Sequence, residues 1–281
     1  MKIRKALEKA RESRQEETLM TRQSDVALDD LLIIDEKPEH FTPTNSQAIE
    51  LNQQKLRDNR MVSMFPEAPE LDSYKILRTQ ILRRTREKGW KTLMVTSALP
   101  GEGKTFTSIN LAITFAKEFD QTVLLVDCDL RRQGIHKQLG FASPTGLIDY
   151  LDQDRPLQDL LIWPGIDKLT LISGGRTIQE STELLGSAKM KALVAEMKNR
   201  YDDRYVIFDT PPILGGADTI AFAPLVDCII MVVEAERTPR RDIAKCLELL
   251  PQEKFLGFVL NRHQDSIKEY EVYGKTYNNK A

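Results

Sequence analysis

Residues 98–106 have the residue types of a phosphate-binding loop. They read ALPGEGKTF and match G-x-x-x-x-G-K-[ST], except that Ala98 replaces the first glycine. Glycines at 101 and 103 let backbone N–H groups point at phosphate oxygens, and a helix that starts near residue 104 adds its positive end. Lys104 is expected to reach the β- and γ-phosphates and Thr105 to offer its hydroxyl to Mg²⁺. The alternative is an ordinary glycine-rich turn. The expected cofactor-binding residues of this loop are Pro100, Gly101, Glu102, Gly103, Lys104, Thr105 and Phe106.

Aspartates end two apolar stretches further along the chain. Asp127 and Asp129 open the sequence DCDLRR, and Asp209 opens DTPP. A carboxylate at the end of a buried strand costs several kcal/mol unless something compensates it. Mg²⁺ or an attacking hydroxyl would do so, and Asp209 is the expected Walker-B carboxylate. Asp127 and Asp129 could instead cap a helix or form a turn. The expected metal ligands are Thr105, Asp127, Asp129 and Asp209.

The elements around these residues alternate between short apolar strands and helices. The expected strands are residues 92–97, 123–127, 169–172, 205–209, 228–233 and 256–261. The expected helices are residues 71–87, 104–119, 132–139, 188–201, 216–223 and 239–250. Continuous Val, Ile and Leu content predicts an α/β fold: a doubly wound, mostly parallel sheet with helices on both faces. Such sheets bind ligands beyond the carboxyl ends of their strands, which is where the loop and the aspartates fall. Together these elements predict that the chain binds ATP or GTP, and ATP with Mg²⁺ is the expected cofactor.

The amino-acid composition argues against several classes of function and location. The 281 residues carry 40 Lys and Arg against 42 Asp and Glu, so no overall basic field favours nucleic acid, and no nucleic-acid partner is expected. Three widely spaced cysteines indicate a reducing compartment. The longest apolar runs fall far short of the ~20 residues that span a bilayer, and the N-terminus lacks a signal-peptide core. The expected location is the cytoplasm.

Three regions are expected along the chain. Residues 1–68 are charged and polar, which predicts a flexible leader or, alternatively, a partner-docking arm that uses the first helix or the apolar patch at 31–34. Residues 69–263 form the nucleotide-binding domain. Residues 264–281 form a polar tail in which tyrosines are poorly explained by packing, because little else there is apolar. Its tyrosines are the expected phosphoacceptors, with docking through aromatic rings as the alternative: Tyr270, Tyr273 and Tyr277.

Over residues 70–281 the sequence resembles the bacterial tyrosine kinases of capsular and exopolysaccharide export. The loop sequence PGEGKT, the stretches DCDLRR and DTPP, and GFVLNR at 257–262 carry the resemblance. It implies an ATP-dependent tyrosine autokinase that regulates polysaccharide synthesis and export. It also implies that Asp127 assists the tyrosine hydroxyl, that Asp129 and Asp209 serve the Mg²⁺ site, and that Asn261 contacts the adenine base. The expected catalytic residues are Lys104, Asp127 and Asp129. Arg131 and Arg132 could stabilise the transferred phosphate or form ion pairs.

The resemblance further implies partners. These are a homo-oligomer, a separate membrane activator of the polysaccharide co-polymerase type that recruits the protein to the inner face of the membrane, and a cognate tyrosine phosphatase. The oligomerisation pattern E-x-x-R-x-x-R of the family is matched only by Asp72, Lys75 and Arg78. Two other functions stay open. One is a partitioning or cell-division-positioning ATPase, although Leu99 stands where those proteins carry a lysine. The other is a nucleotide-gated adaptor without kinase activity.

Overall fold

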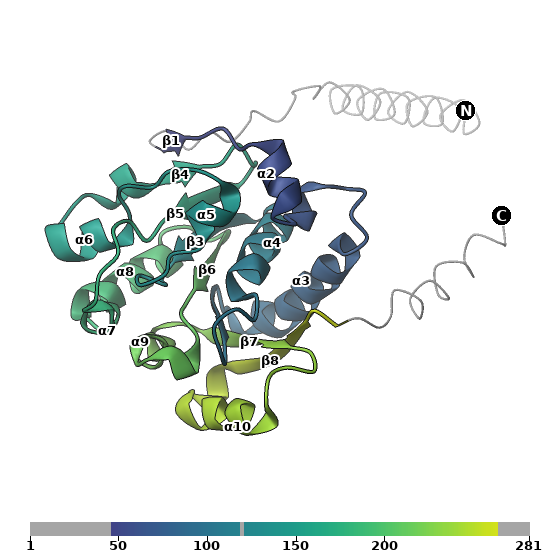
Figure 1. Cartoon of the computed structure of the whole chain (residues 1–281). Coiled ribbons are helices and arrows are strands. Elements are labelled where there is room, and N and C mark those ends of the chain that lie inside the picture. The colour runs from purple at the N-terminus through teal and green to yellow at the C-terminus, as the bar shows by residue number, and fades with distance from the viewer. Residues whose placement is uncertain (1–45, 119–120, 264–281) are drawn as a thin grey trace, which may run out of the picture. The chain divides into compact units, whose positions relative to one another are not determined.

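The computed structural model describes residues 46–118 and 121–263 (Figure 1). Within these residues the strands form one eight-stranded sheet in the order β1-β4-β5-β3-β6-β2-β7-β8. Only the β4–β5 pair is antiparallel; the other neighbours run parallel, as the continuous apolar strands predict. The strands are β1 (Gln47–Ala48), β2 (Thr92–Ser97), β3 (Thr122–Asp127), β4 (Ile162–Trp163), β5 (Leu169–Ile172), β6 (Arg204–Asp209), β7 (Cys228–Glu234) and β8 (Phe255–Asn261).

Helices cover both faces of this sheet (Figure 1). They are α2 (Gln53–Asp58), α3 (Leu71–Thr85), α4 (Lys104–Ala116), α5 (Ile135–Leu139), α6 (Leu147–Gln153), α7 (Ser181–Leu185), α8 (Ala188–Asn199), α9 (Asp218–Phe222) and α10 (Arg240–Leu249). Alternate residues of a strand point to opposite faces, so the central strands feed two separate cores. Leu93 and Val95 of β2 join the core beneath α3 and α4, whereas Met94 joins the one beneath α8 and α10. The predicted doubly wound fold is confirmed.

Two differences from the expected elements have clear physical causes. The helix expected from residue 132 begins only at Ile135, because residues 128–134 form a turn that hydrogen-bonds to Asp127 and Asp129. The short β1 and β4, and helices α6 and α7, were not expected. Each has seven residues or fewer, too few to show a periodic pattern.

The described part of the predicted N-terminal extension packs on the domain. Leu56 and Met61 are fully buried and Phe65 nearly so, all in the core beneath α4. Ser63 is held there as well: its amide donates to the Asn110 side chain at 2.9 Å. These contacts assign residues 46–68 to the domain, although their polar composition predicts an extension. The apolar patch at 31–34 lies outside the described residues.

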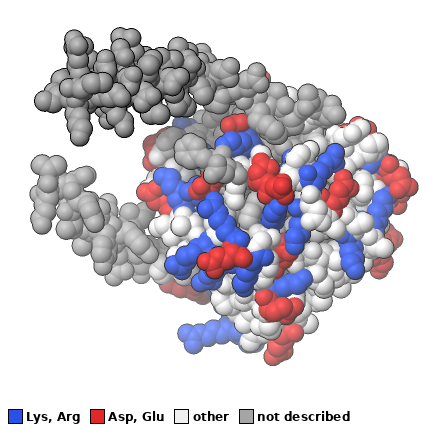
Figure 2. All heavy atoms as spheres, turned by 180° about the vertical axis from the view of Figure 1, so that it is seen from behind, with Lys and Arg blue, Asp and Glu red and all other residues white. Residues whose placement is uncertain are grey.

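The described surface carries mixed charge. Figure 2 shows Lys and Arg side chains interspersed with Asp and Glu on the face turned away from the viewer of Figure 1. A single-sign field that would steer a ligand by charge alone does not form there among the described residues. In the same part of the chain, none of the helices combines the length and the hydropathy needed to cross a bilayer.

Candidate active site

The loop between β2 and α4 has the backbone that phosphate binding requires. Gly101 and Gly103 adopt φ angles of 87° and 93°, in the left-handed region that favours glycine. A Cβ atom on Gly103 would lie 2.1 Å from Nδ2 of Asn261, so that side chain would have to move, and the φ angle would strain any other residue here. The loop then enters α4 at Lys104, where free backbone N–H groups and the positive helix end face the same place.

Glu102, within this loop, stabilises the loop conformation through hydrogen bonds. The residue is 3% exposed, and its carboxylate accepts hydrogen bonds from the amide of Leu99 at 2.8 Å and from the hydroxyl of Thr238. The Asn261 side chain donates to the Glu102 carbonyl oxygen at 2.8 Å. The loop is thereby tied to the ends of β7 and β8, which are otherwise remote from it in sequence.

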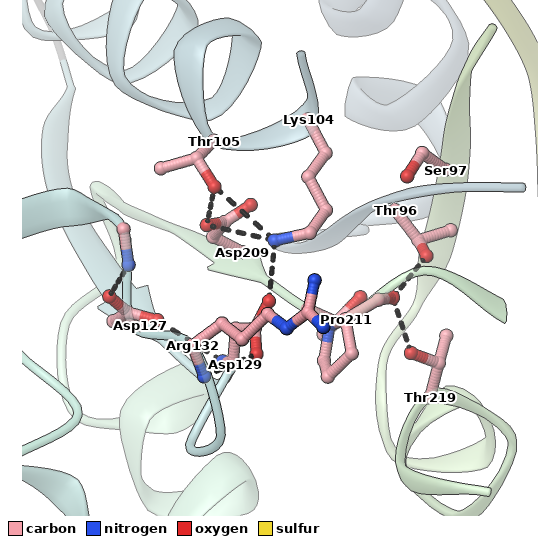
Figure 3. A network of polar contacts seen from close by, with 12 residues as sticks. Thr96, Ser97, Lys104, Thr105, Asp127, Asp129, Arg132, Asp209, Pro211 and Thr219 are labelled. Carbon is pink, nitrogen blue, oxygen red and sulfur yellow. Dashed lines mark hydrogen bonds and ion pairs between the residues drawn. The ribbon is translucent and has the colours of Figure 1, made fainter. Parts of the chain in front are cut away.

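Lys104 and Thr105 lie against carboxylates that come from two other strands (Figure 3). The Lys104 ammonium is 2.8 Å from Asp129 Oδ2 and 3.7 Å from Asp209 Oδ2. Thr105 Oγ1 donates to Asp209 Oδ2 at 2.6 Å. Because β3 and β6 are parallel neighbours with Asp127 opposite Asp209, their acidic ends meet at one edge of the sheet.

The three aspartates are not equivalent. Asp127 is fully buried, and its oxygens accept the amides of Asp129, Gly134 and Ile135 at 3.0–3.1 Å. It therefore caps α5, as the alternative interpretation of this residue allows. A carboxylate offers about four lone-pair positions, so one remains for a further ligand. Asp129 instead turns one oxygen to Lys104 and the other to the amide of Arg132.

Burial and mutual repulsion shift the pKa values of this cluster. Burial raises the pKa of Asp127 to about 7, and the charge of Asp209 acts in the same direction. Burial also raises the pKa of Asp209, against the attraction of Lys104. For Lys104, burial lowers the pKa, but the charges of Asp209 and Asp129 outweigh it and leave the pKa above its ordinary value. Three carboxylates against one ammonium leave a negative site that suits a divalent cation.

The donor set fits Mg²⁺ bound together with phosphates rather than a protein-only cage. Among the described residues, no group of three or more His, Cys, Asp or Glu side chains is placed to hold a metal ion by itself. Mg²⁺ sites of this kind use one or two carboxylates, and water and substrate phosphates complete the octahedron. Thr105 and Asp209, already in contact, provide such a partial set.

The remaining predicted residues have different surroundings. Pro100 and Gly101 are exposed at the tip of the loop, and the ring of Phe106 packs edge-on against Tyr74 with a centroid distance of 6.2 Å. Only the backbone of Phe106 is therefore available to a phosphate. The tail residues Tyr270, Tyr273 and Tyr277 lie outside the described residues.

The structure adds site residues that the sequence analysis missed. Ser108 Oγ donates to Asp209 Oδ1 at 3.1 Å, and the spacing of four residues from Lys104 on one helix is a usable signal for it. Gly134 packs on Thr105, whose Cγ2 would lie 2.8 Å from a Cβ at that position. Thr238, which braces Glu102, sits in a loop without any motif, so no sequence signal marks it.

The predicted oligomerisation residues lie on α3. Lys75 pairs with Asp72 at 2.8 Å, and the side chains of both are exposed. Arg78 points inward, where it contacts Glu118 at 2.7 Å and the carbonyl oxygen of Thr114 at 2.9 Å. Within the described part of the chain, Arg78 therefore ties α3 to α4.

Comparison with known proteins agrees with this geometry. Residues 90–252 match the model of the AAA domain family. The tyrosine-protein kinase YwqD of Bacillus subtilis is 32% identical over 223 residues, which cover 78% of this chain and 93% of that protein. The solved kinase domain of VpsO is 31% identical with a TM-score of 0.62, over 71% of this chain and 99% of that one. The kinase domain of the Escherichia coli tyrosine kinase ETK is 28% identical with a TM-score of 0.63, over 70% and 78% of the two chains. The chain therefore belongs to the bacterial tyrosine-protein kinase family.

Proposed function

We propose that this protein transfers the γ-phosphoryl group of MgATP to tyrosine side chains, including those of its own C-terminal tail. The observation that carries the proposal is the meeting of Lys104, Thr105, Asp129 and Asp209 beside the glycine-containing loop. Family membership supplies the acceptor, because the relatives are named tyrosine-protein kinases.

The loop and α4 would hold the phosphates. Backbone N–H groups around Gly101 and Gly103 would bind phosphate oxygens, and Lys104 would turn from Asp129 to the β- and γ-phosphates. Asn261 would contact the adenine base while its amide holds the loop at Glu102. Transfer by such sites depends mainly on positioning and charge neutralisation.

Thr105 and Asp209 would hold Mg²⁺, with Asp129 and the remaining lone pair of Asp127 close by. When bound, Mg²⁺ would neutralise charge on the β- and γ-phosphate oxygens and keep them in line for transfer. Ser108 keeps the Asp209 carboxylate turned to this position through its hydrogen bond to Oδ1.

The acceptor tyrosine would attack from the open side of the γ-phosphate. A bond forms between its phenolic oxygen and the γ-phosphorus, while the bond from that phosphorus to the bridging oxygen of ADP breaks. The phenolic proton would pass to Asp127, the role that the family resemblance implies for this residue. The products are ADP and phosphotyrosine.

The biological setting is part of the same proposal. The family resemblance supports a role in the synthesis and export of capsule or exopolysaccharide, with recruitment to the membrane by a separate activator. A homo-oligomer would let one copy present its tail to the site of another. Each phosphotyrosine would add roughly −1.5 to −2 charges, so several would repel one another and could loosen such an assembly. A tyrosine phosphatase would then reset it.

Incubation of the purified full chain with labelled ATP and Mg²⁺ tests the activity. Phosphotyrosine should appear on the wild-type protein. It should be lost in Lys104→Met and in the variant with Tyr270, Tyr273 and Tyr277 all changed to Phe. Lys191→Met, which removes an exposed lysine of α8, is the matched control and should label like the wild type.

The outcome that contradicts the kinase assignment is a folded wild-type protein that takes up MgATP yet forms no phosphotyrosine, alone or with the activator's cytoplasmic segment. Labelling that persists in Lys104→Met would instead show that another site, or a contaminating kinase, does the chemistry.

A further inference from the structure

The two consecutive arginines after Asp129 have opposite surroundings. The Arg131 guanidinium donates to Ser181 Oγ at 2.7 Å and to Asp218 Oδ1 at 3.2 Å. Asp218 is 2% exposed and also accepts the hydroxyls of Ser181 and Thr182. Arg131 is thus held by a buried acidic group between α7 and α9 through two of its five N–H donors, although its side chain is 45% exposed.

The main chain of Arg132 is held by a hydrogen bond, whereas its side chain is exposed to solvent. Its amide donates to Asp129 Oδ1 at 3.0 Å, while the other oxygen of that carboxylate binds Lys104 at 2.8 Å. The Arg132 side chain is exposed, and within the described residues its guanidinium forms no hydrogen bond or ion pair. Figure 3 shows this side chain extending from the loop after β3 in the direction of Pro211 and Lys104.

The residues that follow hold the loop against the site. The side chain of Gln133 is buried and donates to the Arg176 carbonyl oxygen at 2.9 Å. Gly134 packs directly on Thr105, where an added Cβ would be 2.8 Å from Cγ2. Arg132 therefore projects from a loop that is anchored at both ends and lies against the residue expected to bind Mg²⁺.

Charge and shape favour a phosphate as the partner of this guanidinium. Arginine presents five N–H donors in a planar fork that matches phosphate oxygens, and it stays charged at any physiological pH. Within the described residues, Lys104 is the ammonium that pairs with Asp129 and Asp209. The Arg132 guanidinium, which extends in its direction in Figure 3, would add a second cation beside a bound triphosphate. A surface arginine that only serves solubility needs neither the anchored loop nor this orientation.

We propose that Arg132 is a further catalytic residue, which binds the phosphoryl group during its transfer, and that Arg131 only anchors the loop. This inference rests on the proposed kinase function. Arg132 would form its contacts mainly when charge builds up on the transferring oxygens, so it would raise kcat more than it would tighten nucleotide binding.

Three variants of the full chain test the inference. Arg132→Ala should lower kcat for tail phosphorylation about 100-fold, the cost of one donor to a transition-state charge, with the affinity for MgADP nearly unchanged. Arg132→Lys should recover only part of the rate, because an ammonium lacks the fork. Arg155→Ala is the matched control: it removes another exposed arginine whose guanidinium has no partner within the described residues, and it should act like the wild type.

A second readout does not depend on tyrosine chemistry. Calorimetry should show that MgADP with aluminium fluoride, a mimic of the transferring phosphoryl group, binds tightly to the wild type and about 100-fold more weakly to Arg132→Ala. Equal binding of this complex to both proteins would overturn the inference, and so would a rise in the KM for the tyrosine acceptor at unchanged kcat. A wild type that binds the complex but labels no tyrosine would contradict the proposed kinase function and leave the role of Arg132 standing on the calorimetry.

Discussion

The two sides of the phosphate loop are built differently. On the side of β3 and β6, charged groups are crowded without full compensation: Asp127, Asp129 and Asp209 surround Lys104. On the side of β7 and β8, Glu102 and Asn261 have protein hydrogen-bond partners at close range. On the first side the carboxylates repel one another, and a bound cation would reduce this repulsion. On the second side hydrogen bonds fix the shape of the loop. Substitutions on the first side should therefore act through charge, and substitutions on the second side through the shape of the loop.

The largest effect is expected from Asp129→Asn on the charged side. It removes the carboxylate that faces Lys104, so activity should fall about 100- to 1,000-fold, the usual cost of one catalytic electrostatic group. The fold should survive, because the amide oxygen of Asn can still accept the Arg132 amide. Initial rates of phosphotyrosine formation, read beside circular dichroism, check this. Asp152→Asn, an exposed aspartate of α6, is the control. Full activity in Asp129→Asn would place the charged side outside the reaction.

Gly103→Ala should produce the next largest effect, through the shape of the loop. The new Cβ would combine a φ of 93° with a contact at 2.1 Å to Asn261. Strain of this kind costs on the order of 1–3 kcal/mol, and the melting temperature should fall while nucleotide affinity is lost. In an Asn261→Ala background, which already lacks the hydrogen bond to the Glu102 carbonyl oxygen, Gly103→Ala should cost only the part due to φ and not the part due to the clash. If Gly103→Ala melts and binds nucleotide like the wild type, the described loop conformation is wrong.

Asp209→Asn should change how the stability of the protein depends on pH. A carboxyl with a raised pKa in the folded state binds its proton more tightly there than in the unfolded chain. The stabilisation from such a proton is full at low pH and is lost as the pH rises through the raised pKa, which for the neighbouring Asp127 is about 7. The Asn side chain can accept a hydrogen bond from one of the two hydroxyls, Thr105 or Ser108, and donate one to the other, and it removes a negative charge.

In Asp209→Asn we therefore expect stability to decline less steeply with rising pH. At pH 8 the melting temperature should be a few degrees higher than that of the wild type, since a stability gain of about 1 kcal/mol corresponds to roughly 2–4 °C. Thermal unfolding between pH 5 and pH 8 measures both. A variant that is less stable than the wild type at pH 8 would show that the aspartates are compensated after all.

The smallest effect is expected from Thr238→Val on the side of β7 and β8. The substitution removes the hydrogen bond to Glu102 and the one that Thr238 Oγ1 accepts from the Glu234 amide at 2.9 Å. Because the buried Glu102 oxygen loses a partner, the free energy of unfolding should fall by about 1–3 kcal/mol. The KM for ATP should rise a few-fold while kcat stays near the wild-type value. Thr238→Ser keeps the hydroxyl and should restore both; a loss of kcat without a change in KM would assign Thr238 to the chemistry instead.

Much of the site could be predicted because its signals are local. The phosphate loop is a contiguous motif, and the aspartates follow apolar strands whose parallel order brings their ends together. The brace formed by Thr238 could not be predicted, since it joins residues 136 positions apart in sequence without a pattern in either. The sequence left open whether Asp127 caps a helix or serves the reaction, because both roles call for the same residue type, and the structure shows the capping hydrogen bonds.

The same reasoning explains the fold. Long apolar strands such as β7 and β6 were readable, whereas the two-residue strands β1 and β4 depend on pairing partners far along the chain. Residues 46–68 look like an extension by composition, yet the few apolar side chains among them, such as Leu56 and Met61, decide their placement by burial. The burial of a few apolar side chains therefore determines where this segment packs, even though its average composition is polar.

Titration of the full chain with ATP in a calorimeter, with Mg²⁺ and with Mg²⁺ chelated, tests the central claim most directly. If the loop, Lys104 and the aspartates share one magnesium–triphosphate, the wild type should bind ATP tightly only with Mg²⁺, and Lys104→Met should lose that binding. Uptake of ATP that is equal with and without Mg²⁺, or unchanged in Lys104→Met, would contradict the account.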